Sequence, residues 1–235
     1  INDAHVLIYN SNGELIGQNY ENPLSGAITV NTKSANGCTI YVVANTGDAN
    51  FFAGYDKHLE KSLTDRIYTL TTWNALNNRS NLPMTGKKER VNITAGNQSL
   101  GNLEVTRMAA KVILNINVAA HSGIIIKDYA LQSVPLKSYY ISRPLSTENA
   151  VTDSNTTPGD DAVSATDNTH WVNGAKVAVN ATSASAEFYM FENRRGVVSS
   201  ITKQKDKVVT NAPAHATYVE ITGTVVSVPA TWKIY

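Results

Sequence analysis

The side chains that most often bind metals or carry out catalysis are widely spaced in this sequence. The five histidines show no H-E-x-x-H motif and no other close ligand spacing; they are His5, His58, His121, His170 and His215. A group of aspartates lacks the carboxylate spacing and the distal glutamate of a calcium loop; it consists of Asp153, Asp160, Asp161 and Asp167. The sequence therefore predicts no metal site, and it predicts no cofactor.

Motifs for nucleophilic catalysis and for phosphate binding are also missing. The sequence contains no G-x-S-x-G, G-x-x-x-x-G-K-[ST] or G-x-G-x-x-G string. Cys38 is the single cysteine, so no intramolecular disulfide can form, and no basic residue stands beside it to activate its thiol. We predict that the protein is not an enzyme.

One short string resembles a processing signal. The segment L-P-M-T-G at residues 82–86 matches the L-P-x-T-G string that sortases cleave to anchor proteins to a cell wall. A sortase signal is followed by an apolar span and a basic tail, whereas a long sequence with strand patterns follows here. We interpret the string as a loop in which Pro83 restricts φ and Gly86 allows a turn, before a strand over Arg90–Ala95.

Aromatic side chains offer a different chemistry, the stacking of sugar rings. Trp171 and Trp232 are the candidate glycan contacts, with Trp73 and the Tyr139-Tyr140 pair as further aromatic groups. Large aromatic residues more often pack in a core or on a sheet face, so the two interpretations compete. N-x-[ST] triplets, which suit a glycosylated ectodomain but also arise by chance, begin at Asn78, Asn92, Asn97, Asn155 and Asn180.

Composition narrows the class of protein. The chain has 235 residues, more than the roughly 100–150 of a common single domain, so two domains are the natural expectation. Charged residues make up 17% and the formal net charge is +1, without a basic face, which argues against a nucleic-acid partner. No run approaches the roughly 18 apolar residues of a membrane helix, so the mature chain is not expected to span a membrane.

The elements that must position these side chains read mostly as strands. Residues tolerant of positive φ follow the first strand at positions 10–13 and predict a hairpin. Lys111–Val118 alternates cleanly between apolar and polar residues. The remaining expected strands are Glu14–Gly17, Ala27–Val30, Thr39–Ala44, Ile124–Val134, Lys176–Asn180, Ala186–Phe191 and Thr217–Val228, with Ala4–Tyr9 as the first.

Two segments depart from this strand pattern. Leu59, Leu63, Ile67 and Leu70 are spaced by four, four and three residues and predict one amphipathic helix. Residues 145–170 are rich in Ser, Thr, Asn, Asp, Pro and Gly, which predicts a long mobile loop. A fresh run of strands starts near Arg107, so we expect domains over residues 1–106 and 107–235.

Six strings occur in an order that resembles a known family. They are V-L-I-Y with N-G at 6–13, I-Y-V-V-A-N at 40–45, L-P-M-T-G at 82–86, V-T-R-M-A-A-K-V at 105–112, Y-M-F-E-N at 189–193 and A-T-Y-V-E-I at 216–221. Together they resemble the fimbrillins of Bacteroidetes-type fimbriae, the FimA/Mfa-like family. The resemblance implies an all-β fold of two transthyretin-like Greek-key β-sandwich domains, with the short helix in the first.

The resemblance also implies a function. The chain would be a structural subunit of an extracellular cell-surface fimbria, exported through the outer membrane as a lipoprotein precursor. It would polymerise with subunits of the same or a related type by donor-strand insertion and support adhesion to a host or bacterial surface protein or glycan. Apolar alternation near both chain ends leads us to expect that Val6, Ile8, Val219 and Ile221 form or border the polymerisation interface. The alternative is a carbohydrate-binding or tip adhesin ectodomain that does not polymerise.

Overall fold

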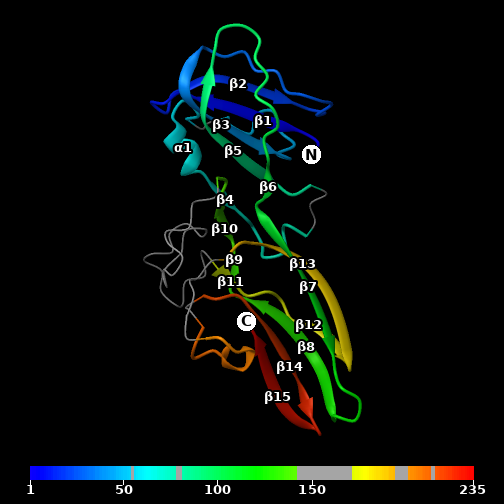
Figure 1. The fold of residues 1–235 in the computed structure, drawn as a ribbon. Coiled ribbons are helices and arrows are strands. Elements are labelled where there is room, and N and C mark those ends of the chain that lie inside the picture. The colour runs from blue at the N-terminus through cyan, green and yellow to red at the C-terminus, as the bar shows by residue number, and fades with distance from the viewer. Residues whose placement is uncertain (54–55, 78–80, 142–170, 194–200, 213–214) are drawn as a thin grey trace. The chain divides into compact units, whose positions relative to one another are not determined.

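The computed structural model describes residues 1–53, 56–77, 81–141, 171–193, 201–212 and 215–235. The predicted mobile loop over 145–170 lies outside these ranges, together with His170, Asn78, Asn155 and the four clustered aspartates. The fold is all-β, as predicted (Figure 1). The transthyretin-like Greek-key arrangement stays a prediction.

The described part of the chain contains fifteen strands. They are β1 (Ala4–Tyr9), β2 (Leu15–Glu21), β3 (Ala35–Ala44), β4 (Ile67–Thr69), β5 (Met84–Ile93), β6 (Thr106–Arg107), β7 (Ala109–Asn117), β8 (Ile124–Gln132), β9 (Val134–Pro135), β10 (Lys137–Tyr139), β11 (Trp171–Val172), β12 (Val177–Ala181), β13 (Ser183–Phe191), β14 (Tyr218–Val225) and β15 (Val228–Ile234). The described helices are α1 (Glu60–Thr64) and a 3-10 turn, η2 (Gln204–Asp206).

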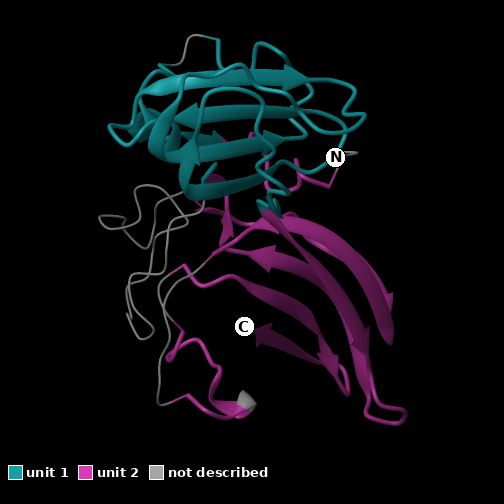
Figure 2. Ribbon diagram, turned by 45° about the horizontal axis from the view of Figure 1, so that its top comes forward, with its two compact units in different colours: residues 1–68, 79–108, 139–142 teal, residues 69–78, 109–138, 143–235 magenta. Residues whose placement is uncertain are grey.

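The chain divides into two compact units, each made of segments that are distant in sequence (Figure 2). Unit 1 comprises Ile1–Tyr68, Arg79–Met108 and Tyr139–Ser142, and unit 2 comprises Thr69–Asn78, Ala109–Ser138 and Arg143–Tyr235. The predicted domain division between residues 106 and 107 stays a prediction.

Unit 1 is built on a five-stranded antiparallel sheet with the order β2-β1-β3-β5-β6. Every residue of β1 is buried, because the strand is paired on both sides and packed on both faces. On one face Leu7 and Tyr9 join a cluster with Leu63. On the other face Val6 and Ile8 join a second cluster. Because alternate side chains of a strand point to opposite faces, β1 contributes to two separate cores.

Unit 2 packs a four-stranded sheet, β12-β8-β14-β15, and a two-stranded sheet, β13-β7, around one core. Ile126 on β8 and Ile221 on β14 contribute from the first sheet, and Phe188 on β13 contributes from the second. The core-facing side of each sheet is therefore apolar, and the other side is solvated, as expected for a sandwich. Some apolar residues on these strands are exposed, among them Ile113 and Ile125.

Four expected elements differ from the structure, and the first three lie in unit 1 or at its boundary. Residues 27–30 form a loop instead of a strand. The apolar residues that suggested a strand, Ile28 and Val30, pack from this loop against the second core of unit 1. Strand β5 begins at Met84, so the predicted loop at 82–86 is already strand from its third residue. The predicted helix is a single turn, α1, and Ile67 lies in β4 instead of on a helix. β-branched residues beyond Thr64 favour extended backbone there.

The predicted strand over Thr217–Val228 is a hairpin of two strands. Val225 pairs with Val228, and the two residues between them, Val226 and Ser227, both have positive φ values of 47° and 69°. Such a turn follows the right-handed twist of the strands but normally carries Asn or Gly. Valine gives no sequence signal for it, which is why the alternation pattern missed the turn.

We predict that Val226→Asn stabilises the protein. A β-branched residue in the left-handed region costs about 1–2 kcal/mol, and asparagine tolerates that region far better. Removing about 1 kcal/mol of this cost should raise the melting temperature by about 2–4 °C in calorimetry. Val209→Asn is the control, because Val209 is also exposed but is not among the positive-φ residues. An equal rise in both variants would contradict the prediction.

Candidate functional site

The predicted chemistry-bearing residues do not converge in the described part of the chain. Among those residues, no three His, Cys, Asp or Glu side chains lie together in a way that could hold a metal ion. None of the described helices is both long enough and apolar enough to cross a membrane. The Cys38 thiol is buried, donates to the carbonyl oxygen of Ala35 at 3.4 Å, and has a pKa raised by that burial.

His5 is the buried histidine of unit 1. Its ring stacks on Tyr20 with a centroid distance of 4.2 Å, and its Nε2 donates to the carbonyl oxygen of Asp48 at 2.9 Å. Burial lowers the pKa of His5 below 6.5, outweighing this hydrogen bond and the carboxylates of Asp3 and Asp48, which act in the opposite direction. His5 is therefore neutral near pH 7.

A pH dependence of stability follows from this burial. The unfolded chain binds a proton on His5 more readily than the folded protein, so this contribution to stability is complete above about pH 6.5 and is lost as the pH falls through the lowered pKa. Urea unfolding at pH 7 and pH 5 should therefore show a larger loss of stability in the wild type than in His5→Gln. His58→Gln, at an exposed position, should retain the full loss. Equal losses in wild type and His5→Gln would contradict the prediction.

The four residues expected at the polymerisation interface are all buried. Val6 and Ile8 lie on β1, between β2 and β3, and are 6% and 3% exposed. Val219 and Ile221 lie on β14, between β8 and β15, and belong to the core of unit 2. The structure thus places the two pairs in different units.

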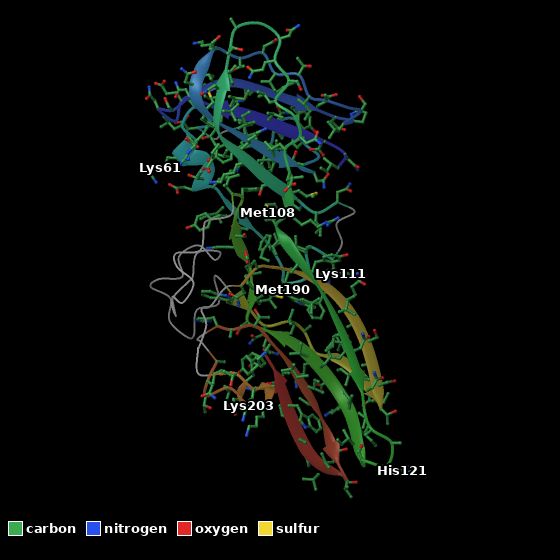
Figure 3. The ribbon with its side chains drawn as sticks, viewed as in Figure 1. Lys61, Met108, Lys111, His121, Met190 and Lys203 are labelled. Atoms are coloured by element: carbon green, nitrogen blue, oxygen red, sulfur yellow. The ribbon has the colours of Figure 1, made fainter. Side chains whose placement is uncertain are left out.

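A strip of apolar side chains on β7 is only half covered. Val112, Leu114 and Ile116 alternate along β7 and pack against the core of unit 2, yet each remains partly exposed; we call them the β7 strip. Lys111, which precedes Val112, lies on the opposite face of β7 (Figure 3). Its Nζ forms an ion pair with Oε2 of Glu187 on β13 at 2.7 Å. The β7 strip is therefore the inward face of a sheet that does not fully cover its core.

The reason is that β7 has only one partner among the described strands. It pairs with β13 from Ala109 to Asn117, and its other edge carries backbone groups without a neighbouring strand. A single residue, Thr182, joins β12 to β13, so these two strands lie at the same edge of the sandwich. The free edge of β7 therefore faces the β14–β15 side (Figure 1). Such an edge can accept a further strand.

The edge strand of the other sheet shows a matching feature. On β15, Val228, Ala230, Trp232 and Ile234 stand opposite the core-facing residues of β14, and we call them the β15 strip. Ile234 is 45% exposed, whereas Val219, its pairing partner on β14, is 8% exposed. At the hairpin end, Val228 is 65% exposed and its partner Val225 is 36% exposed. Inward-facing apolar side chains are thus uncovered at the edges of both sheets of unit 2.

The two tryptophans expected to contact glycans have packing partners. Trp171 is 2% exposed, stacks on His215 with 4.1 Å between ring centroids, and its indole N–H lies 3.3 Å from Oδ1 of Asn193. Trp232 packs against the core of unit 2. Their burial is the kind that large aromatic residues ordinarily have, and a glycan contact at either stays a prediction. The packing of Trp171 had no signal in the sequence, because its partners come from distant segments.

Solved structures of several surface proteins share this fold. The tip fimbrial protein Mfa3 from Porphyromonas gingivalis matches with a TM-score of 0.59 and 15% identity over 99% of this chain and 75% of that one. A protein from Bacteroides eggerthii, provisionally described as a cell adhesion protein, matches with a TM-score of 0.58 and 22% identity, over 99% of this chain and 71% of that one. A fimbrilin from P. gingivalis matches with a TM-score of 0.55 and 17% identity, over 96% of this chain and 65% of that one. At these identities the likeness concerns the fold.

Family models give the closer assignment. A model of a domain of unknown function matches residues 188–235. No curated protein sequence matches the chain. The model of the major fimbrial subunit protein FimA matches residues 1–118, which is half of the chain and includes the strand, loop and β7 strings noted above. The fimbrillin resemblance is therefore confirmed, and the chain belongs to the FimA family of major fimbrial subunit proteins.

Proposed function

We propose that this fimbrial subunit assembles by accepting a β-strand from a neighbouring subunit along the free edge of β7. The observation that carries the proposal is the β7 strip, whose half-covered apolar side chains adjoin an edge without a partner strand among the described residues. An added strand would pair with that edge and cover the β7 strip and part of the β15 strip. The protein would thus act at the cell surface by assembly and adhesion, without catalysis.

The energetics favour such an insertion. Each aliphatic side chain that becomes fully buried contributes about 1.5–3 kcal/mol, and each ladder hydrogen bond adds about 0.5–1.5 kcal/mol. Ordering the incoming strand costs about 1–2 kcal/mol per residue. The net gain is modest, so the durability of a fibre would depend on slow release of a deeply buried strand as much as on affinity. Val219 and Ile221 would form the floor of this site.

The other predicted pair of interface residues has a different setting. Val6 and Ile8 lie on a strand with partners on both sides, so exchange there would first require loss of β2 or β3. Their role in polymerisation stays a prediction. The adhesion ligand and export as an outer-membrane lipoprotein precursor are also proposed on the basis of the family. Assembly partners are other fimbrial subunits.

Hydrogen exchange distinguishes the two sites. In the isolated subunit, alternate amides of residues 109–117 should exchange quickly because one edge of β7 is open, and they should become protected in fibres. Amides of residues 4–9 should be protected in both states, since β1 is paired on both sides. New protection over 4–9 with none over 109–117 would overturn the proposal.

A further inference from the structure

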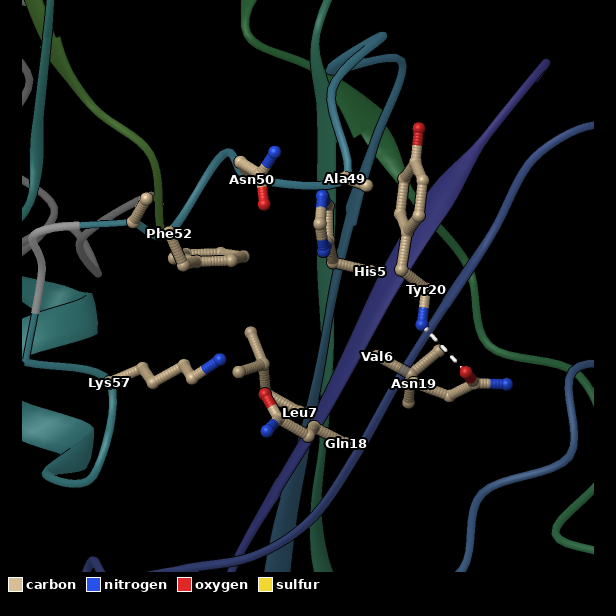
Figure 4. Close-up of a pocket in the computed structure, with 11 residues that line it drawn as sticks. His5, Val6, Leu7, Gln18, Asn19, Tyr20, Ala49, Asn50, Phe52 and Lys57 are labelled. Atoms are coloured by element: carbon tan, nitrogen blue, oxygen red, sulfur yellow. Dashed lines mark hydrogen bonds between the residues drawn. The ribbon is translucent and has the colours of Figure 1, made fainter.

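A hollow of about 280 Å³ opens on unit 1, beside the first hairpin (Figure 4). β1 and β2 supply one wall, where His5 pairs with Tyr20 and Leu7 pairs with Gln18. The loop after β3 supplies Asn50 and Phe52, and Lys57 comes from the segment before α1. Ligand pockets for drug-sized molecules span about 300–1,000 Å³, so this hollow suits a ligand of a single ring.

The loop that forms the second wall is held in place by Asp3. The carboxylate of Asp3 accepts hydrogen bonds from the backbone N–H and hydroxyl of Thr46 and from the N–H of Gly47, all within 3.0 Å. Farther along, the side chain of Asp48 accepts from the N–H of Asn50. The wall is therefore preorganised, which reduces the entropic cost of binding a ligand.

The inner part of the hollow is apolar and aromatic, with one polar atom of fixed role. Leu7, His5 and Phe52 are each less than 10% exposed, and the Phe52 ring meets the His5 ring edge-on at 88°. Because Nε2 of His5 donates to Asp48, the neutral ring leaves Nδ1 as an acceptor, and no described residue donates to it. The perpendicular rings offer no parallel faces between which a flat aromatic ligand could stack.

The rim supplies polar groups that the described residues leave without partners. The side-chain amides of Gln18 and Asn50 are exposed and form no hydrogen bond within the described chain. Lys57 is partly exposed, and its ammonium group likewise forms no hydrogen bond with a described residue. In Figure 4 the Lys57 nitrogen lies towards the space bordered by Leu7, His5 and Phe52. Each amide presents a donor and an acceptor in one plane, which matches a pair of neighbouring hydroxyl groups.

We propose that this hollow binds a single neutral pyranose residue of a glycan. A pyranose combines an apolar C–H face, suited to the partly exposed Tyr20 ring that lines the hollow, with hydroxyl groups that both donate and accept hydrogen bonds, suited to Gln18 and Asn50. An acidic ligand is disfavoured because the carboxylates of Asp3 and Asp48 act on the same region as the Lys57 charge. The site belongs to unit 1 and the proposed strand-acceptor edge belongs to unit 2, so the proposal does not depend on the proposed assembly.

Saturation-transfer NMR on the 235-residue chain tests the proposal. The probes are the methyl glycosides of galactose, mannose, glucose, fucose and N-acetylglucosamine, together with glucuronate. At least one neutral glycoside should bind saturably with a Kd of about 1 mM, the strength expected of a small site. Gln18→Ala and Asn50→Ala, both at exposed positions that the fold does not need, should each weaken that binding at least fivefold.

Asn12→Ala is the matched control, since Asn12 is also an exposed asparagine of unit 1 whose side chain forms no hydrogen bond within the described chain. It should leave binding unchanged. The proposal is overturned if no neutral glycoside binds, or if binding is unaffected by both Gln18→Ala and Asn50→Ala. Binding of glucuronate alone, lost in Lys57→Gln, would equally overturn it and make the hollow an anion site.

Discussion

Leu114→Glu is expected to abolish fibre formation while leaving the subunit folded. Leu114 is the central residue of the β7 strip and is partly exposed in the subunit, where a glutamate could still reach solvent. In a fibre the inserted strand would cover it, and burying an unpaired carboxylate costs several kcal/mol. Since 1.4 kcal/mol corresponds to a factor of ten, assembly should fall at least a hundredfold. Negative-stain electron microscopy of fibres measures the effect.

Its control is the adjacent residue. Ile113 lies on the same strand, points to the opposite face and is 59% exposed. Ile113→Glu therefore introduces the same charge at the same depth of the strand without touching the β7 strip. Fibres should form normally in this variant, and thermal unfolding should show that both variants remain folded. Normal fibres from Leu114→Glu, or equal loss in both variants, would contradict strand acceptance at β7.

Leu63→Ala is expected to give the largest loss of stability among single changes in α1. Leu63 is fully buried in the core cluster that contains Tyr9, Tyr41 and Phe52. Removing its side chain leaves a cavity as well as losing apolar burial, and such changes cost about 3–5 kcal/mol. For a chain of this size the melting temperature should fall by about 6–20 °C, measured by calorimetry.

Leu59 provides the comparison, because it immediately precedes α1 and is 50% exposed. Leu59→Ala should change the stability by less than about 0.5 kcal/mol, as expected of a surface position. The periodic pattern Leu59, Leu63, Ile67 and Leu70 would have made all four equivalent core residues of one helix. Similar losses of stability in Leu59→Ala and Leu63→Ala would support the longer predicted helix and contradict the single turn.

Local pattern determined much of the sheet content of this protein. The alternation along Lys111–Val118 predicted β7 and which of its side chains face inward, because strand side chains point to opposite faces with a period of two. The residues tolerant of positive φ at 10–13 likewise predicted the hairpin that joins β1 to β2. The all-β class and the fimbrial family were both predicted at this level and are confirmed.

Tertiary structure alone decided the properties on which function depends. The pattern of β1 marks Val6 and Ile8 as apolar, but only strand order shows that they have partners on both sides. By contrast, the half-covered β7 strip looks like any core strand in sequence, since the lack of a second partner strand among the described residues leaves no local pattern. The hollow around His5 assembles three chain segments, and the turn at Val226 goes against the preference of its own residue. Periodicity reports which face a side chain takes, whereas coverage of that face depends on residues far along the chain.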